Sequence, residues 1–341
     1  MKAYRGALIG CGFFAINHLH GWRGVEGTQI VALCDSDPAR LASVGAQFGI
    51  AARYGDAGEM LAREKLDFVD IATTVSSHRP LVELVARHGV GVICQKPLAS
   101  SLQDAQAMVA ACQAAGAPLM VHENFRWQSA IQAVGESVRK GEIGEPFWGR
   151  VSFRSAFDVF SGQPYLAKGE RFIIEDLGIH ILDIARFLFG DVASATARVR
   201  RVNPAIQGED VATMLLDHRN GVTCVVDCSY ATRLAVEPFP ETLIEIDGSA
   251  GTIRLGQDYR LVVANAGGVH RRDLSPPILP WASRPWHNIQ ESVQAIEQHW
   301  INCLREGREP STSGRDNLKT LALVEAAYQS AQTGKTVELS P

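Results

Sequence analysis

A single lysine stands where a buried strand is expected to end. Lys96 follows the apolar run 90–94 and Gln95, and it precedes Pro97, which restricts Lys96 to an extended backbone. Because ligands of open α/β sheets bind at the carboxyl ends of the strands, we expect the ammonium group to project into a ligand crevice. There it could stabilise negative charge that develops on a substrate oxygen. The alternative is a surface lysine whose stem covers the strand end.

A second polar set falls on one face of a predicted helix. In RFIIEDLGIHILDIARFLFGD, Asp176, His180 and Asp183 lie at i, i+4 and i+7. Histidine suits a general base because its unperturbed pKa of about 6.5 is close to neutral pH. The set could instead satisfy itself in a core, and a metal site has weak support because no cysteine or further histidine is near. Gly178, which costs about 1 kcal/mol relative to alanine in mid-helix, indicates a close approach to the backbone.

The stretch GCGFFA fills a GxGxxG/A pattern between a predicted strand, 7–9, and a predicted helix, 14–24. Small residues there let the backbone approach a pyrophosphate, whose charge meets the positive end of the helix. The pattern alone is weak evidence, but its position after a strand and before a helix is the required one. The predicted phosphate-binding residues are Gly10, Gly12, Phe13, Phe14 and Ala15.

An acid follows at the distance that dinucleotide binding requires. Asp35 ends the next predicted strand, twenty residues after Ala15. A carboxylate there accepts hydrogen bonds from the ribose hydroxyls and repels a 2′-phosphate, so we expect NAD rather than NADP. Arg40 could bind that phosphate or stack on adenine. In the alternative interpretation the glycines only make a tight turn, and Asp35 caps the helix after Pro38.

The periodicity of the chain predicts two domains of different construction. Residues 1–125 alternate short apolar runs with helical patterns, which is typical of a parallel sheet wrapped by helices. Residues 126–341 offer many short strands, joined by turns such as Asn220-Gly221, and two closing helices, 289–305 and 316–332. The expected fold class is α/β: an N-terminal Rossmann dinucleotide-binding domain followed by a C-terminal α+β domain with an open, mainly antiparallel sheet.

Composition excludes several classes of function. The 341 residues are 46% hydrophobic and 21% charged, with a formal net charge of −4, and no basic or acidic run indicates a nucleic-acid or membrane partner. No segment reaches transmembrane length, and the amino terminus is too broken for a signal peptide. Seven scattered cysteines lack the spacing of a zinc site or disulfide framework. We expect a reduced, cytoplasmic protein with no bound metal.

Taken together, the motifs resemble the glucose-fructose oxidoreductase / inositol dehydrogenase / MocA family of nicotinamide sugar dehydrogenases. The resemblance covers essentially the whole chain and rests on the order of GCGFFA, CDSDPAR, DFVDIATTVSSH, CQKPLA, NFRW and EDLGIHILDIARFLFG. The family's second signature is usually Glu-Lys-Pro, and this chain has Gln95 instead of the glutamate, which puts in doubt how the nicotinamide ribose or the lysine charge is handled. HENFRWQ and GCGFFAINHLHGW resemble one sugar-dehydrogenase branch of that family.

The resemblance implies roles for particular residues. Lys96, Asp176 and His180 map onto the catalytic lysine, aspartate and histidine, and we expect Lys96 and His180 to act on one substrate oxygen beside the nicotinamide. The remaining implied residues are Thr73, His78 and Gln95 on the cofactor side and Asn124, Arg126 and Arg154 around the substrate. The substrate is expected to be a sugar or polyol, although two arginines could also indicate a carboxylate such as a uronate. The open sheet resembles the surface through which relatives form dimers or tetramers.

Three functions stay open at this point. The first is a dehydrogenase; the second is a glycosidase that retains NAD and oxidises its substrate transiently; the third is a sensor that binds NAD and sugar without chemistry. A sensor has no need of a base, so the presence of Lys96, Asp176 and His180 argues against it. Trp281, Trp286 and His287 lie in the proline-broken stretch SPPILPWASRPWHN, which could form a lid or a packed linker.

Overall fold

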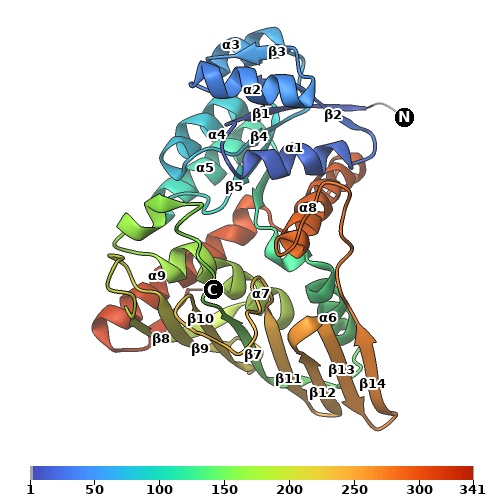
Figure 1. Ribbon diagram of the computed structural model, residues 1–341, viewed down its shortest axis with the longest axis vertical. Coiled ribbons are helices and arrows are strands. Elements are labelled where there is room, and N and C mark those ends of the chain that lie inside the picture. Colours follow the sequence, from blue (N-terminus) through green and yellow to red (C-terminus); the bar gives the residue numbers. More distant parts are fainter. Residues whose placement is uncertain (1–2, 341) are drawn as a thin grey trace. The chain divides into compact units, whose positions relative to one another are not determined.

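The computed structural model describes residues 3–340, which form two compact units. The first comprises residues up to 124 together with 290–318, and the second comprises 125–289 together with the residues from 319 onward. The first boundary lies one residue from the predicted one. The prediction assigned 290–318 to the second domain, whereas this segment packs with the first unit, because α8 (His287–Glu306) lies against α1 (Ala15–Arg23) through the Gln290–Asn17 hydrogen bond (Figure 1).

The first unit is built on a parallel sheet of six strands in the order β3-β2-β1-β4-β5-β6. Because consecutive strands are joined through helices, all carboxyl ends meet at one edge. The strands are β1 (Tyr4–Ile9), β2 (Thr28–Cys34), β3 (Ala52–Tyr54), β4 (Phe68–Ile71), β5 (Gly91–Gln95) and β6 (Leu119–His122). This confirms the predicted Rossmann arrangement and adds β3, which is too short to show a pattern.

Helices α2 (Pro38–Phe48), α3 (Ala57–Arg63), α4 (His78–Arg87) and α5 (Leu102–Ala115) complete the first unit together with α1 and α8. Their ends follow capping chemistry: Asp37 accepts hydrogen bonds from the first amides of α2, and Ser101 does so for α5. Gly49 and Gly116 end α2 and α5 in the left-handed conformation, which glycine adopts most readily. Asp35 is not the cap of α2, so that alternative interpretation is wrong.

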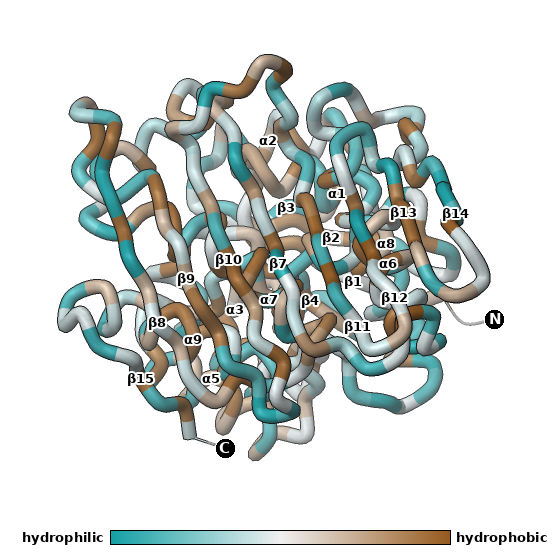
Figure 2. The backbone as a smooth tube through the Cα atoms, turned by 90° about the horizontal axis from the view of Figure 1, so that it is seen from below, coloured by the Kyte–Doolittle hydropathy of each residue, from teal (hydrophilic) through white to brown (hydrophobic). Residues whose placement is uncertain are grey.

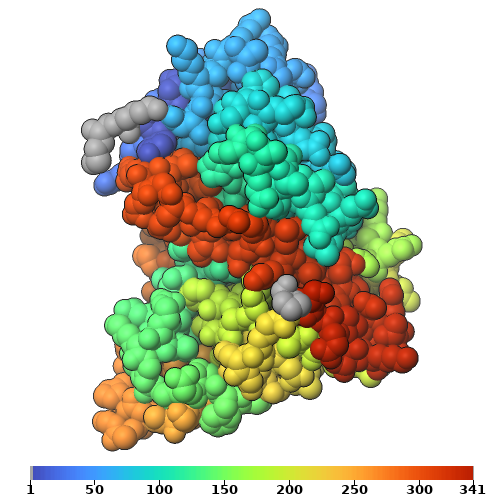
Figure 3. Space-filling model, turned by 180° about the vertical axis from the view of Figure 1, so that it is seen from behind, coloured from blue at the N-terminus to red at the C-terminus, as the bar shows by residue number. Residues whose placement is uncertain are grey.

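Figure 3 shows α5 beside the segment after α8, and residues of both line a cavity on the surface of the first unit. Its walls include Pro118 and Leu119, at the start of β6, and Gly314. A Cβ on Gly314 would lie 2.6 Å from Leu119, so glycine is needed for this close packing. The cavity opens at the amino end of β6 and is therefore separate from the edge where the strands of a parallel sheet bind ligands.

The second unit is built on a nine-stranded sheet in the order β14-β13-β12-β11-β7-β10-β9-β8-β15. Only the β7–β10 pair is parallel among its described pairs, which confirms a mainly antiparallel sheet. The strands are β7 (Pro146–Arg154), β8 (Val192–Arg200), β9 (Val211–His218), β10 (Thr223–Ser229), β11 (Leu243–Gly248), β12 (Gly251–Leu255), β13 (Arg260–Asn265), β14 (Gly268–Asp273) and β15 (Val337–Glu338).

Helices cover one face of this sheet. α6 (Ser129–Arg139) and α7 (Ile179–Phe189) lie behind the strands in Figure 2, and α9 (Gly314–Thr333) contributes its later turns to the second unit. Phe189 at the end of α7 fills the space beside Gly149 of β7, where a Cβ would lie 2.3 Å from the ring. The other face of the sheet is open: on β9, buried and exposed residues alternate, and Leu215 is 44% exposed.

Candidate active site

The predicted glycine turn has the geometry of a phosphate cradle. Gly10, directly after β1, has φ of +95°, and a Cβ there would lie 2.6 Å from the carbonyl oxygen of Ala72, so only glycine fits. A Cβ on Gly12 would meet nothing within 4 Å, which leaves open space above the backbone. Ala15 is fully buried at the start of α1, whereas Phe13 is mostly exposed. The turn therefore offers room for a pyrophosphate at a helix N-terminus.

Asp35 joins the end of β2 to this turn. Its Oδ2 accepts a hydrogen bond of 2.6 Å from the Cys11 amide, and its Oδ1 accepts one of 2.8 Å from the Asp37 amide. The Arg40 guanidinium lies 3.8 Å from Asp35 and 3.5 Å from Asp37. The carboxylate is placed at the carboxyl edge beside the glycine turn, where a ribose contact is expected, and it also braces the turn.

Thr73 lies on the loop after β4, and His78 is the first residue of α4. His78 is buried, and burial lowers its pKa below the usual value. Its Nε2 lies 3.2 Å from the Thr73 carbonyl oxygen, and its Nδ1 lies 3.1 Å from the carbonyl oxygens of Pro97 and Leu98. A neutral imidazole has one N–H, so His78 donates to one of these sides and packs against the other, between the loop after β4 and the loop after β5. This contact is structural, and a direct contact of His78 with a cofactor stays a prediction.

Lys96 follows the buried strand β5 at the carboxyl edge of the parallel sheet, as its sequence position predicted. Its backbone amide donates a hydrogen bond of 2.7 Å to Oε1 of Gln95. The Lys96–Pro97 peptide is cis, and Lys96 itself is half-buried. At the same edge, after β6, the buried Asn124 donates from Nδ2 to the Ser292 hydroxyl at 2.6 Å. Its contact with a substrate stays a prediction.

The helix that carries the second polar set is interrupted. Residues Ile174–Gly178 form a π-helical turn before α7 begins at Ile179. A Cβ on Gly178 would lie 3.3 Å from the carbonyl oxygen of Ile173, so the close approach that Gly178 indicated is by the preceding turn. The prediction of one continuous α-helix was wrong at this point. The observed π-helical turn is wider than an α-helical turn, and it shifts Asp176 relative to the later residues. Such π-turns are frequent at functional sites.

Asp183 and Arg126 form a buried ion pair within the second unit. Arg126 donates from Nε to Oδ2 at 2.6 Å and from Nη2 to Oδ1, and the Thr320 hydroxyl donates to Oδ1 at 3.2 Å. Asp183 is fully buried and Arg126 nearly so. This bidentate geometry turns the Asp183 carboxylate toward Arg126, so Asp176 is the better candidate to orient His180. The predicted substrate residue Arg126 has a clear structural role here.

Replacing Asp183 with asparagine is expected to lower the free energy of unfolding by about 3–5 kcal/mol, because it leaves the Arg126 charge buried without its partner. The loss can be measured by urea unfolding followed by circular dichroism. Glu136→Gln, which breaks the exposed pair with Lys140 on α6, is the matched control and should change stability little. Equal losses in the two variants would contradict the importance of the buried pair.

His180 lies on the first turn of α7 and is 5% exposed. Its ring stacks on Phe125, with centroids 3.9 Å apart and planes inclined by 6°. Stacking fixes the plane of the imidazole, so its nitrogens can move only within that plane. An oriented imidazole is what a general base requires.

Arg154 has a different environment from His180. On β7, Val151 and Phe153 face the helices, so Arg154 alternates to the opposite face of the sheet. There its Nη1 donates to Asp227 on β10 at 3.0 Å, and Asp227 also accepts from Arg150. A substrate role for Arg154 therefore stays a prediction.

Two residues of the proline-broken stretch, Trp286 and His287, pack against other aromatic residues. Trp286 makes edge-on contacts with Phe157 and Phe239, at centroid distances of 5.8 and 5.0 Å. His287 is buried, with its ring edge-on to Tyr259. These contacts favour the packed linker over a mobile lid for both residues.

Comparison with known proteins places the chain among oxidoreductases. Residues 4–123 match the family described as "Oxidoreductase family, NAD-binding Rossmann fold", and residues 131–254 match the "GFO/IDH/MocA C-terminal domain". The chain belongs to this GFO/IDH/MocA family. It is therefore an NAD-binding oxidoreductase, as the motifs predicted.

Individual relatives are similar over the whole chain. The chain is 67% identical over 339 residues to a D-apiose dehydrogenase of Rhizobium rhizogenes, covering 99% of this chain and 98% of the relative. It is also 67% identical to a D-apiose dehydrogenase of Paraburkholderia graminis, covering 99% and 90%. The crystal structure of an oxidoreductase from Agrobacterium radiobacter in complex with NAD+, L-tartaric acid and magnesium matches with a TM-score of 0.98 and 67% identity, covering 99% and 98%.

In this GFO/IDH/MocA chain, the glycine turn fits the cofactor that the family binds. The open space over Gly12 admits phosphate groups to the backbone at the start of α1, and Asp35 is placed for the ribose. Gly10, Gly12 and Ala15 would hold the pyrophosphate, with Asp35 at the adenosine end. Bound NAD supplies the hydride acceptor.

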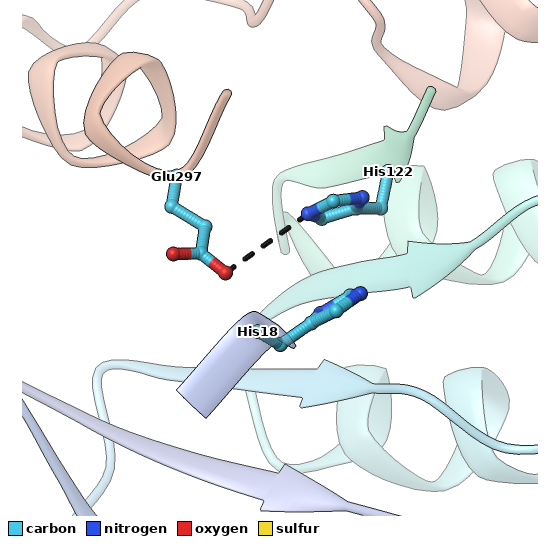
Figure 4. A group of neighbouring side chains, drawn as sticks. All are labelled: His18, His122 and Glu297. Carbon is cyan, nitrogen blue, oxygen red and sulfur yellow. Dashed lines mark ion pairs between the residues drawn. The ribbon is translucent and has the colours of Figure 1, made fainter. Parts of the chain in front are cut away.

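Sequence reasoning missed one buried polar cluster of the GFO/IDH/MocA chain. His18 of α1, His122 of β6 and Glu297 of α8 are all fully buried, with one potential ligand atom of each lying within 4.8 Å of the others (Figure 4). The two imidazoles stack with centroids 4.0 Å apart and planes inclined by only 25°, so their in-plane lone pairs do not converge on a common point. This geometry does not suit a metal ion. The only sign of this cluster in the sequence was a histidine, His122, in the otherwise apolar strand LMVH.

None of the helices in the described part of the chain is both long enough and apolar enough to cross a membrane.

Proposed function

We propose that this chain is an NAD-dependent dehydrogenase that oxidises D-apiose or a related aldose. The 67% identity to D-apiose dehydrogenases over 99% of the chain is the observation that carries the proposal. The two stretches HENFRWQ and GCGFFAINHLHGW, which indicated a sugar-dehydrogenase branch, agree with it. A polyhydroxylated substrate suits a site with several hydrogen-bond donors.

In the proposed reaction, His180 is the base that removes the proton from the substrate hydroxyl. Its ring plane is held by Phe125, and Asp176 is proposed to orient it. A neutral imidazole accepts a proton readily near neutral pH. Asp183 is left out of this role, because its carboxylate is bound by Arg126.

Lys96 is proposed to donate a hydrogen bond to the same hydroxyl oxygen. Its ammonium group stabilises the negative charge that develops there as the proton leaves. The position of Lys96 at the carboxyl edge of the parallel sheet supports this role, since that edge is where cofactors of this fold bind. Asn124 is the proposed substrate contact from the same edge.

Incubation of the protein with NAD and a panel of free sugars, with D-apiose included, and of simple glycosides tests the proposal. We expect D-apiose to give the highest kcat/KM, with a rise in absorbance of reduced nicotinamide, and we expect NADP to be a poorer acceptor because Asp35 repels its 2′-phosphate. Sugar release from a glycoside without net reduction would indicate the glycosidase. Binding of sugar without either product would indicate the sensor.

We further propose that the chain forms a homodimer or homotetramer through the open face of the second unit's sheet. Leu215 on β9, an apolar residue that is 44% exposed and alternates with buried neighbours, supports an interface there. Light scattering that gives the mass of one chain would contradict it. The seven described cysteines, all free and buried, support the proposal of a reducing, cytoplasmic setting.

A further inference from the structure

The side chain of Gln95 makes two hydrogen bonds, and it accepts in one and donates in the other. Its Oε1 lies 2.7 Å from the backbone nitrogen of Lys96, and its Nε2 lies 3.1 Å from Nε2 of His18. A backbone N–H can only donate, so the atom facing Lys96 must be the amide oxygen. The atom facing His18 is then the amide nitrogen, which can only donate.

This arrangement determines the tautomer of His18. Because the Gln95 amide donates to Nε2, that ring nitrogen must carry a lone pair, and the proton resides on Nδ1. Nδ1 lies 2.8 Å from Oδ2 of Asp70, which also accepts a 2.8 Å hydrogen bond from Nε1 of Trp22. All of these donors and acceptors are compatible with a neutral imidazole and an ionised Asp70.

The surroundings of His18 favour an ionised Asp70. Burial acts to raise the pKa of Asp70, but the neighbouring His18, the hydrogen bonds from His18 and Trp22, and His122 lower it on balance. Glu297 of α8 is fully buried, and burial together with Asp70 raises its pKa well above the usual range. From β5, burial likewise raises the pKa of the Cys94 thiol.

We infer that Gln95 is a positioning residue for Lys96. Trp22 and Asp70 hold His18 in place, and Gln95 connects His18 to the backbone of Lys96. The chain of hydrogen bonds begins in the core, at Asp70, and ends at the Lys96 amide. On the other side of Lys96, the carbonyl oxygens of Pro97 and Leu98 lie against His78. The backbone that carries the ammonium group is thus fixed from both sides, which matters because misplacement by about 1 Å can cost about 10²-fold in rate.

The inference rests on the proposed role of Lys96, and Gln95→Glu tests it through pH. A protonated glutamate reproduces both bonds: its carbonyl accepts from Lys96 and its O–H donates to His18. An ionised glutamate cannot donate to the lone pair of His18 Nε2, so it can bond to His18 only if the ring takes a proton on Nε2, and the tautomer that the chain requires is lost. Relative to the unaltered protein, kcat of Gln95→Glu should lie within about threefold near pH 6 and fall by about tenfold or more near pH 9.

Two further variants complete the test. Gln95→Met keeps the volume but makes neither bond, so its relative kcat should be lower by about tenfold at every pH. Gln103→Glu, at an exposed position on α5, is the matched control and should track the unaltered protein throughout. A relative kcat of Gln95→Glu that does not change with pH, or a Gln95→Met variant with full activity, would overturn the inference while leaving the proposed function intact.

A measurement without turnover separates the two proposals. In protein labelled with nitrogen-15 histidine, the His18 resonances, assigned by their loss in His18→Gln, should show a neutral ring protonated on Nδ1, and in Gln95→Met this preference should weaken. Protonation on Nε2 or on both nitrogens would overturn the inference. If no sugar reduces NAD, the proposed function fails, and this spectrum still decides whether the hydrogen-bond chain exists.

Discussion

Replacing Lys96 with methionine is expected to lower kcat by about 10²- to 10³-fold, which is the usual cost of removing one donor to a developing oxyanion. Methionine has nearly the same length and keeps the packing of the stem at the end of β5, but it cannot donate to the substrate oxygen. The glycine turn and Asp35, which carry the predicted NAD contacts, are separate elements of the sheet. The dissociation constant of NAD, measured by fluorescence titration, should therefore change by less than about threefold.

Lys65→Met, at an exposed position before β4, is the matched control, since it removes the same charge from the same unit. It should leave both kcat and NAD affinity unchanged. If Lys96→Met instead loses NAD affinity and retains kcat at saturating NAD, Lys96 is a cofactor ligand and the proposed role in charge stabilisation is wrong.

The parallel sheet was predictable because its strands are buried on both faces. In β5 (GVICQ), for example, residues 91–94 form a buried apolar run between helices, and such runs are typical of a parallel sheet covered on both sides. β14 (GVHRRD) was missed for the converse reason, since all six of its residues are exposed and no alternation marks it. Its place in the sheet depends on pairing with β13, which the local sequence does not encode.

The candidate site was predictable where it follows strand ends and unpredictable where distant residues meet. Lys96 and Asp35 lie at the carboxyl edge because strand direction alone places them there. The pair of Arg126 with Asp183 joins residues 57 positions apart, and nothing local distinguishes that arginine from a substrate ligand. The π-turn at 174–178 escaped prediction because one wider turn leaves the apolar spacing of the segment almost unchanged.

Replacing His180 with alanine is expected to lower kcat/KM by about 10²- to 10⁴-fold, the range for loss of a general base. The base must be unprotonated to act, so the rate of the unaltered protein should fall at acid pH, and this acid limb should disappear in the variant. Steady-state rates of NAD reduction across the pH range measure both effects.

A second variant is needed to distinguish the role of His180 as a base from its role in packing, because alanine also removes the ring that stacks on Phe125. His180→Phe keeps an aromatic ring against Phe125 but has no nitrogen to accept a proton, so it should be as inactive as His180→Ala while unfolding at nearly the temperature of the unaltered protein. His270→Ala, at an exposed position on β14, should change neither property. If His180→Phe keeps near-normal activity with its acid limb intact, the imidazole serves packing alone, and the proton must leave through another group.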